Sequence, residues 1–327
     1  MQCSSTSIDE PRQPFVSIIV TTYNSAKYVI KTLQSAMKQT YQNIELVVSD
    51  DCSKDDTVEL CARWIEDNNH RFVRTALVTS SQHSGIAPNF NQGLKVAKGL
   101  WVKFIAGDDI LKDNCIADCI DYINNSPEKV EILSGAMKQF TGNIESLDLA
   151  AEYSNELDTF FTKSAKEQHL LLLKANRIMA PAVLIRRSLL ASMHGFDERY
   201  PMLEDYPFWL KATEKGIRIH GFSKIICFYR IHAESVYSSA LVRPYVINPF
   251  YEHVERFEKD YVYERLNHVQ KLERKCRYAR YRLVSYLGNN CNNLFVRHLN
   301  KLLDPVYLHL KLKSWSDIAK KPMDDSI

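Results

Sequence analysis

The sequence lacks an apolar run of the length that a membrane-spanning helix needs. About 18 to 20 apolar residues in a row would be required, and the longest apolar stretches among these 327 residues fall far short of that. The opening segment, MQCSSTSIDEPRQP, is polar and has no apolar core typical of a secretory signal. We therefore expect a soluble or peripheral protein of the cytoplasm, which could lie on the inner face of the cytoplasmic membrane.

An excess of one charge and closely paired cysteines are also missing. The formal net charge of +3 is too small to imply nucleic-acid binding by itself, so no nucleic-acid partner is expected. The eight cysteines form no C-x-x-C pair. Cys115 and Cys119 are one helical turn apart, which fits packing better than metal ligation. Scattered cysteines in a chain of this size are typical of a reducing cytosol.

The first third of the chain alternates short strands with amphipathic helices. Strands are expected at 15–24, 44–51, 75–80 and 100–109, and helices at 26–39, 56–68 and 86–98. This alternation predicts a Rossmann-like α/β unit whose parallel sheet has helices on both faces. The turn after the first strand, TTYNSAKY, contains no glycine. That excludes the G-x-G-x-x-G dinucleotide motif and the P-loop at this position.

The remainder of the chain is less regular. Further strands are expected at 131–140, 177–187 and 224–232, and a helix at 204–215. From about residue 250 the sequence becomes long helices rich in Tyr, Leu, Lys and Arg. The length allows one large domain with an appendage, or two domains.

Polar and acidic clusters follow three of the predicted strands. They are Thr21–Asn24, Asp50–Ser53 and Gly107–Asp109. In an open α/β sheet these strand ends meet at one edge, where ligands bind. Carboxylates there could accept hydrogen bonds from a base or ribose, and a carboxylate pair could hold a hard cation against a diphosphate. The alternative is that each cluster is ordinary turn chemistry.

Four motifs in order resemble those of family 2 glycosyltransferases of the GT-A fold. The resemblance covers about residues 14–235 and rests on VSIIVTTYNSAKYVIKTLQSAMKQTYQNIELVVSDDCSKDDT, AKGLWVKFIAGDDI, GFDERYPMLEDYPFWLKATEKG and FYRIH. It implies a mixed α/β sheet flanked by helices, with a C-terminal helical extension. The implied division is a flexible start at 1–13, a catalytic domain at 14–240 and a basic helical region at 241–327. Within the catalytic domain, 14–110 would bind the nucleotide and 111–240 the acceptor.

The resemblance also implies which residues hold the donor. Thr21, Tyr23 and Asp50 match positions that hold the nucleotide base and ribose, and Asn24 belongs to the first of these loops. Asp51 and Ser53 complete the second loop, where a structural role in the turn is the alternative.

A third donor segment, 83–94, occupies the place of the family's loop and helix before the D-x-D strand. Asn91 stands there where a polar residue often meets the donor, and Ser84 is a candidate N-cap.

The metal assignment rests on the family's D-x-D motif. Asp108 matches its last acid, which contacts the metal and the donor diphosphate, and Asp109 would support the loop. Ala106 replaces the first acid, so a two-carboxylate grip is not expected. One acid with diphosphate and water could still hold Mg²⁺ or Mn²⁺. His232 matches a basic position that contacts the metal or diphosphate in several relatives, although a lone histidine after a strand is often structural.

Glu204 and Asp205 resemble the family's E-D motif, in which the aspartate is the general base. Inverting transfer needs a base to take the proton of the acceptor hydroxyl, and a buried carboxylate can do so if its pKa rises. The alternative is an acid pair that caps the following helix. Arg230 could pair with the diphosphate or only with a neighbouring acid.

The resemblance implies an inverting hexosyl- or N-acetylhexosaminyltransferase that uses a nucleotide sugar, with a UDP-sugar as the default. The acceptor would be a glycan or lipid-linked saccharide of surface polysaccharide synthesis, such as O-antigen or capsule. A nucleotidyltransferase and a non-catalytic nucleotide-sugar-binding protein are the alternatives. The segment 265–313 has eleven Lys or Arg against two acids. It predicts either an anionic membrane contact or a face packed in the protein or an oligomer.

Overall fold

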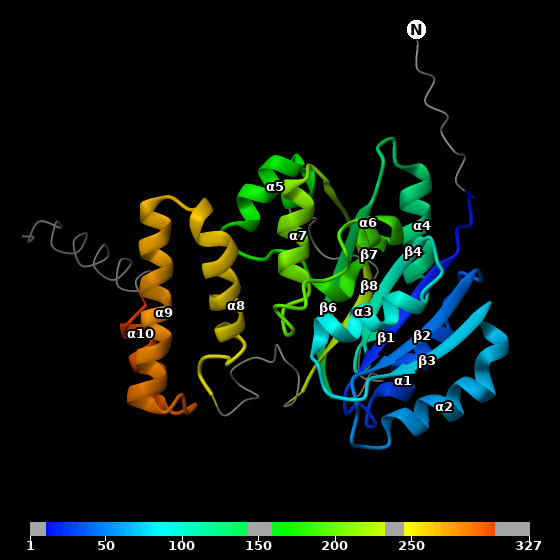
Figure 1. Cartoon of the computed structure of the whole chain (residues 1–327), viewed down its shortest axis with the longest axis horizontal. Coiled ribbons are helices and arrows are strands. Elements are labelled where there is room, and N and C mark those ends of the chain that lie inside the picture. The colour runs from blue at the N-terminus through cyan, green and yellow to red at the C-terminus, as the bar shows by residue number, and fades with distance from the viewer. Residues whose placement is uncertain (1–10, 143–158, 233–244, 305–327) are drawn as a thin grey trace, which may run out of the picture. The chain divides into compact units, whose positions relative to one another are not determined.

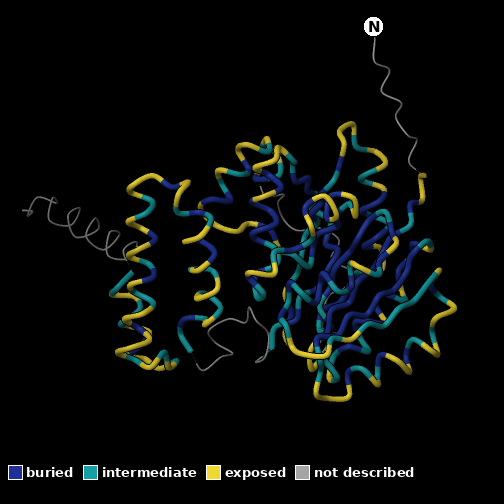
Figure 2. The backbone as a smooth tube through the Cα atoms, viewed as in Figure 1, coloured by how far each residue is buried: buried dark blue, intermediate teal, exposed yellow. Residues whose placement is uncertain are grey.

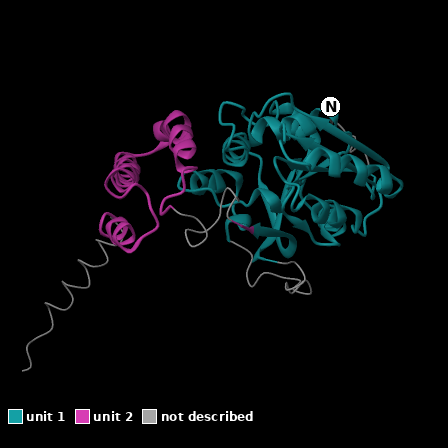
Figure 3. Cartoon of the chain, turned by 90° about the horizontal axis from the view of Figure 1, so that it is seen from below, with its two compact units in different colours: residues 1–230 teal, residues 231–327 magenta. Residues whose placement is uncertain are grey.

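The computed structural model describes residues 11–142, 159–232 and 245–304. The chain divides into two compact units, residues 1–230 and residues 231–327 (Figure 3). Within the described ranges, no helix combines the length and the apolar character that crossing a bilayer needs.

A mixed sheet of eight strands forms the centre of the first unit (Figure 1). Its order is β3-β2-β1-β4-β7-β6-β8-β5. The first four strands of the chain run parallel, whereas β7 pairs antiparallel with both β4 and β6, and β5 pairs antiparallel with β8. The strands are β1 (Val16–Thr22), β2 (Ile44–Asp50), β3 (Arg74–Thr79), β4 (Trp101–Ala106), β5 (Ile110–Leu111), β6 (Ile132–Thr141), β7 (Val183–Arg186) and β8 (Ile219–Ile231).

Helices flank this sheet, which confirms the predicted fold class (Figure 1). Those of the first unit are α1 (Val29–Met37), α2 (Thr57–Asn68), α3 (Ile86–Val96), α4 (Cys115–Asn125), α5 (Ala165–Leu172), α6 (Arg187–Ser192) and α7 (Asp205–Glu214). Those of the second unit are α8 (Tyr251–Phe257), α9 (His268–Gly288) and α10 (Leu294–Leu302).

Strand β1 is buried on both faces, as its run of β-branched residues predicts. Val16, Ile18 and Val20 alternate along one face and join the main core cluster with residues of α1, α2 and α4. Ile19 lies on the other face, under α3. A Cβ on Gly93 of α3 would lie 2.5 Å from Ile19 Cγ2, so this helix approaches the strand as closely as glycine allows. The two packed faces hold the carboxyl end of β1 in a fixed position.

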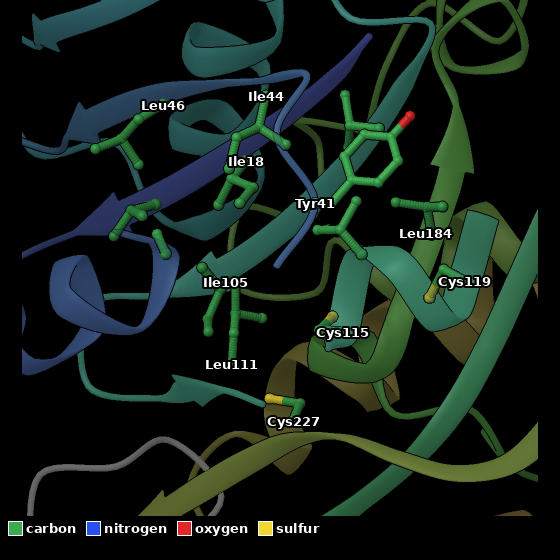
Figure 4. Packing of buried hydrophobic residues seen from close by; sticks show 14 of the residues in the cluster. Ile18, Tyr41, Ile44, Leu46, Ile105, Leu111, Cys115, Cys119, Leu184 and Cys227 are labelled. Atoms are coloured by element: carbon green, nitrogen blue, oxygen red, sulfur yellow. The ribbon is translucent and has the colours of Figure 1, made fainter. Parts of the chain in front are cut away.

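The cysteines predicted to pack do so. Cys115 and Cys119 on α4 and Cys227 on β8 are buried in the main core cluster among side chains such as Leu184 (Figure 4). The described cysteines are all free thiols. Cys115, Cys119 and Cys227 therefore act as small apolar residues of the core.

The prediction of a strand over 177–187 was wrong for its first half. Only Val183–Arg186 forms a strand, because Ala180–Ala182 is a short 3₁₀ turn. Pro181 lies within that turn and has no backbone N–H to donate to a ladder. The strand expected at 224–232 begins earlier, at Ile219, and the two-residue strand Ile110–Leu111 was not predicted.

The second unit is helical in its described part, as expected from about residue 250. A buried carboxylate joins its helices. Glu258 forms ion pairs with Arg274 and Arg277 of α9 and accepts a hydrogen bond from the Tyr278 hydroxyl. The buried Glu258 carboxylate is neutralised by two guanidinium groups and hydrogen-bonded by one hydroxyl. These contacts fix α9 against the segment after α8.

Candidate active site

Three loops meet at the carboxyl ends of β1, β2 and β4. The Asp51 N–H donates to Thr22 O at 3.0 Å, and the Gly107 N–H donates to Thr21 O at 2.8 Å. A Cβ on Gly107 would lie 2.9 Å from Thr22 Cγ2, so only glycine fits this approach. Asn24, in the left-handed region at φ 49°, accepts a hydrogen bond from the Lys54 N–H at 2.8 Å. The predicted clusters thus lie side by side at one edge of the sheet.

The carboxylate of Asp50 is used within these loops. It is buried and accepts hydrogen bonds from the Thr22 hydroxyl at 2.8 Å and from the Ser53 N–H at 2.8 Å. The Ser53 hydroxyl donates to it as well. Asp50 therefore shapes the loop after β2, and Ser53 holds that loop against Asn24 through its hydroxyl.

Asp51, also buried, binds the segment that precedes α3. Its carboxylate accepts hydrogen bonds from the Ser84 N–H and hydroxyl at 2.9 and 2.7 Å and from the Gly85 N–H at 2.7 Å. His83 Nδ1 lies 2.8 Å from the same carboxylate. The suggestion that Ser84 caps α3 was wrong, because Gly85 is the N-cap residue, at φ 104°, and the Ser84 hydroxyl is bound to Asp51.

Tyr23 and His83 form an exposed aromatic pair beside Asp51. Their rings stack at a centroid distance of 4.0 Å and an angle of 22°. Tyr23 is 43% exposed and the His83 side chain 48%. Sequence reasoning selected Tyr23 but missed His83, which comes from a different loop and has no motif of its own. The pair offers a flat aromatic surface on which a base could stack.

Asp109 and Arg230 support the loop after β4. Asp109 is fully buried and accepts a hydrogen bond from the Arg230 N–H at 2.9 Å, and Arg230 Nε donates to Asp108 O at 2.9 Å. The guanidinium of Arg230 lies over the rings of Tyr28 and Phe140. Burial, with the charge of Asp108, raises the pKa of Asp109 well above its usual value. Asp109 is thus a buried structural group, and Arg230 acts on the loop backbone.

Glu204 and Asp205 lie at the start of α7 and are both half-buried. Asp205 accepts one hydrogen bond on each oxygen, from the Tyr206 N–H at 2.6 Å and from Asn176 Nδ2 at 2.8 Å. Glu204 is the N-cap residue but makes no side-chain cap, whereas Asp205 is an acid in the first turn of α7 and accepts a backbone hydrogen bond there, so the capping alternative stays open for Asp205. Asn176, 29 residues away in the sequence, was not predicted.

The two carboxyls have different acidities. Burial, with the charge of Asp205, raises the pKa of Glu204 to about 8. Burial also raises the pKa of Asp205, but hydrogen bonds from Asn176 and Tyr206 and the nearby Trp209 indole act against that rise. Near neutral pH Glu204 is therefore largely protonated, and the hydrogen bonds to Asp205 favour its ionised form.

An apolar pocket adjoins this pair and explains its desolvation. Its walls come from α3, β4, β7 and α7, and its lining is Phe90, Phe104, Ala180, Val183, Ile185, Phe196, Glu204, Asp205 and Trp209. Phe104 belongs to β4, the strand that ends at the Gly107–Asp109 loop, so the pocket lies along the same strand as that cluster. Asn91 is buried and exchanges hydrogen bonds with the backbone of Phe196, and also donates to Glu198. Asn91 thereby fixes one wall of the pocket.

The predicted metal ligands are Asp108 and His232. Asp108 is half-buried at the end of β4, and His232 is half-buried directly after β8. In the part of the chain that the structure describes, no three His, Cys, Asp or Glu side chains gather as a metal site. A single carboxylate such as Asp108 fits a cation carried largely by substrate phosphates and water, as Mg²⁺ often is.

Comparison with known proteins matches this chain to a family profile. The profile described as Glycosyl transferase family 2 matches residues 17–192. Among similar proteins is WfaP of Escherichia coli, named as a UDP-Glc:alpha-D-GlcNAc-diphosphoundecaprenol beta-1,3-glucosyltransferase. It is 28% identical over 221 residues, which cover 68% of this chain and 79% of WfaP.

Solved structures show the same fold. TarS of S. aureus has a TM-score of 0.54 and 22% identity, covering 81% of this chain. The chain spans only 43% of TarS, and residues 1–349 of TarS have been solved with UDP-GlcNAc. The mannosyltransferase PcManGT of Pyrobaculum calidifontis, solved with GDP-Man and Mn²⁺, has a TM-score of 0.52 and 20% identity. It covers 68% of this chain, which spans 59% of PcManGT.

Proposed function

The chain belongs to glycosyl transferase family 2, and on that premise we propose that it transfers a sugar, with inversion, from a UDP-sugar to a hydroxyl of a lipid-linked saccharide. The chain is thus a glycosyltransferase with a GT-A fold, and we assign the reaction to residues 14–240. One observation carries the proposal: the Asp205 carboxylate, held by hydrogen bonds from Asn176 and Tyr206, lies at an apolar pocket beside β4, the strand that leads to the predicted donor loops.

Asp205 is the general base in this proposal. The acceptor hydroxyl loses its proton to Asp205, its oxygen forms a bond to the anomeric carbon, and the bond from that carbon to the diphosphate breaks. The diphosphate leaves with the electron pair from the opposite face. A carboxylate whose pKa is raised by burial takes this proton more readily than an exposed one. Glu204 stays protonated near neutral pH, so it is a hydrogen-bond donor and leaves Asp205 as the base.

The nucleotide occupies the edge formed by the loops after β1 and β2. The base stacks on the exposed pair Tyr23 and His83, next to Thr21 and Asp51. Asp50, Asn24 and Asn91 support the donor site through the hydrogen bonds that shape its loops and wall. The UDP-Glc of the WfaP name and the UDP-GlcNAc bound to TarS favour uridine as the base. The transferred sugar would be a hexose or an N-acetylhexosamine.

Mg²⁺ or Mn²⁺ would assist the departure of the diphosphate by neutralising its charge. Asp108 and His232 would hold the ion together with the diphosphate oxygens and water. The Mn²⁺ bound to PcManGT supports this assignment. Arg230 holds the Asp108 loop through its hydrogen bond to Asp108 O.

The acceptor assignment follows the name of WfaP, whose acceptor is a diphosphoundecaprenol-linked sugar. Such an acceptor belongs to surface polysaccharide synthesis and would place the reaction at the inner face of the cytoplasmic membrane.

The test is a transfer assay with UDP-sugars and a diphospholipid-linked acceptor, in which UDP release and the anomeric configuration of the product are followed. Asp205→Asn should retain UDP binding in calorimetry and lose turnover. Wild-type rates in that variant would show that Asp205 is not the base. Release of pyrophosphate with formation of a nucleotide sugar would instead identify a nucleotidyltransferase, and UDP-sugar binding without turnover would identify a binding protein.

A further inference from the structure

Helix α9 carries a second apolar stripe, opposite its packed face. The packed face is marked by the buried Arg274, Tyr278 and Val284. At 100° per residue, the second stripe is centred on the other side of the helix and runs along it for about 25 Å. Its members are all exposed and recur at alternating intervals of three and four residues: Val269, Leu272, Cys276, Ala279, Leu283 and Tyr286.

Large exposed apolar side chains are concentrated in this part of the molecule. Of the twelve found among the described residues, eight lie between Val269 and Leu302. Val269 is 75% exposed and Tyr286 is 86% exposed. Figure 2 shows exposed residues recurring along α9. A contiguous exposed apolar surface of this kind marks an interaction site.

Basic side chains follow one flank of the stripe. Lys271, Lys275 and Arg282 lie on that side of α9, four and seven residues apart. Arg282 pairs with Glu255 of α8, whereas Lys271 and Lys275 form no ion pair with any described residue. From Arg265 to Asp304 the chain has nine Lys or Arg and two acids. An antiparallel second copy of the stripe would bring like charges together along this flank, whereas an anionic surface would neutralise them.

We propose that α9 docks the protein on an anionic lipid bilayer. The apolar stripe enters the boundary between headgroups and acyl chains, and Lys271 and Lys275 extend to the lipid phosphates. This inference rests on the proposed function in one respect, since a lipid-linked acceptor is met at such a surface. α10 adds exposed apolar and basic side chains of the same kind, including Phe295 and Lys301.

The test is co-sedimentation of the full chain with phosphatidylcholine vesicles that contain or lack phosphatidylglycerol. We expect binding only to the anionic vesicles, weakened by salt. Lys271→Gln with Lys275→Gln should weaken binding roughly thirtyfold, from ~1 kcal/mol per basic residue near anionic lipid. Leu272→Ser with Leu283→Ser should abolish it. Val73→Ser, at an exposed valine of the first unit, is the matched control and should bind as the wild type does.

Two kinds of result would overturn the proposal. The first kind is a failure of the vesicle assay: the wild type does not bind anionic vesicles at low salt, or the variant with Leu272→Ser and Leu283→Ser (the stripe variant) binds them equally well. The other is a change of oligomeric state. If light scattering shows the wild type as a dimer and the stripe variant as a monomer, and neither protein binds vesicles, a second copy of the chain covers the stripe. UDP binding and transfer to a water-soluble acceptor are measured without vesicles. Vesicle binding without transfer would therefore contradict only the proposed function.

Discussion

Removing the side-chain amide of Asn176 should move the pH dependence of transfer to higher pH. Asn176 Nδ2 donates to Asp205 Oδ2 at 2.8 Å, and its own Oδ1 accepts from the Ile178 N–H at 3.1 Å, which fixes the orientation of the amide. This bond favours the ionised form of Asp205 and so lowers its pKa against the effect of burial. A hydrogen bond to a charged group contributes about 1.5–3 kcal/mol. Asn176 is exposed, so the lower end applies, which corresponds to about one pH unit.

The assay is kcat/KM as a function of pH for Asn176→Ala. Because the base must be ionised, we expect the acidic limb to rise by about one pH unit, with near wild-type rates above it. Asn125→Ala removes an exposed amide that bonds only within α4 and should leave the profile unchanged. A uniform fall in rate at every pH, with no shift of the acidic limb, would refute the role of Asn176 in setting the ionisation of Asp205.

Three further predictions concern stability. The pKa of Glu204 is raised to about 8 in the folded protein, so the wild type loses stability as the pH rises from about 5 to 9. Glu204→Gln removes this titration and should raise the free energy of unfolding by roughly 2 kcal/mol near pH 8, measured by urea titration. Glu258→Ala leaves Arg274 buried without its partner and should cost about 3–5 kcal/mol, seen as a lower denaturation midpoint; an unchanged midpoint would contradict the buried network. Gly93→Ala should cost about 1–3 kcal/mol in the same titration because its Cβ would collide with Ile19, and a gain in stability would show that α3 can move away.

The parallel half of the sheet could be predicted from the sequence because its signals are local. β1, β2 and β3 are each short runs followed by a helix with its own periodicity, and β1 and β2 begin and end within two residues of their expected bounds. The later strands depend on long-range pairing. Pro181 turns the chain before β7, and Ile110–Leu111 forms a strand only because it pairs with β8, more than a hundred residues on.

The residues of the candidate site also differ in whether the sequence alone could reveal them. Asp50, Asp108 and Asp205 belong to motifs that can be found in the sequence. His83 and Asn176 do not, because their contacts to Asp51 and Asp205 come from loops about 30 residues away that meet only in the folded chain. Arg230 was found by its motif, but its contacts with the Asp108 loop could only be seen in the structure.

The way the loops after β1 and β2 hold one another bears on how the proposed donor site could be retargeted to another nucleotide. The carboxylates of Asp50 and Asp51 are occupied by the chain itself, so changing either would loosen the loops before it altered selectivity. Tyr23 and His83 extend from that framework with their side chains partly in solvent. A mutant library for a new donor base should therefore vary these two aromatic positions and leave the aspartates beneath them intact.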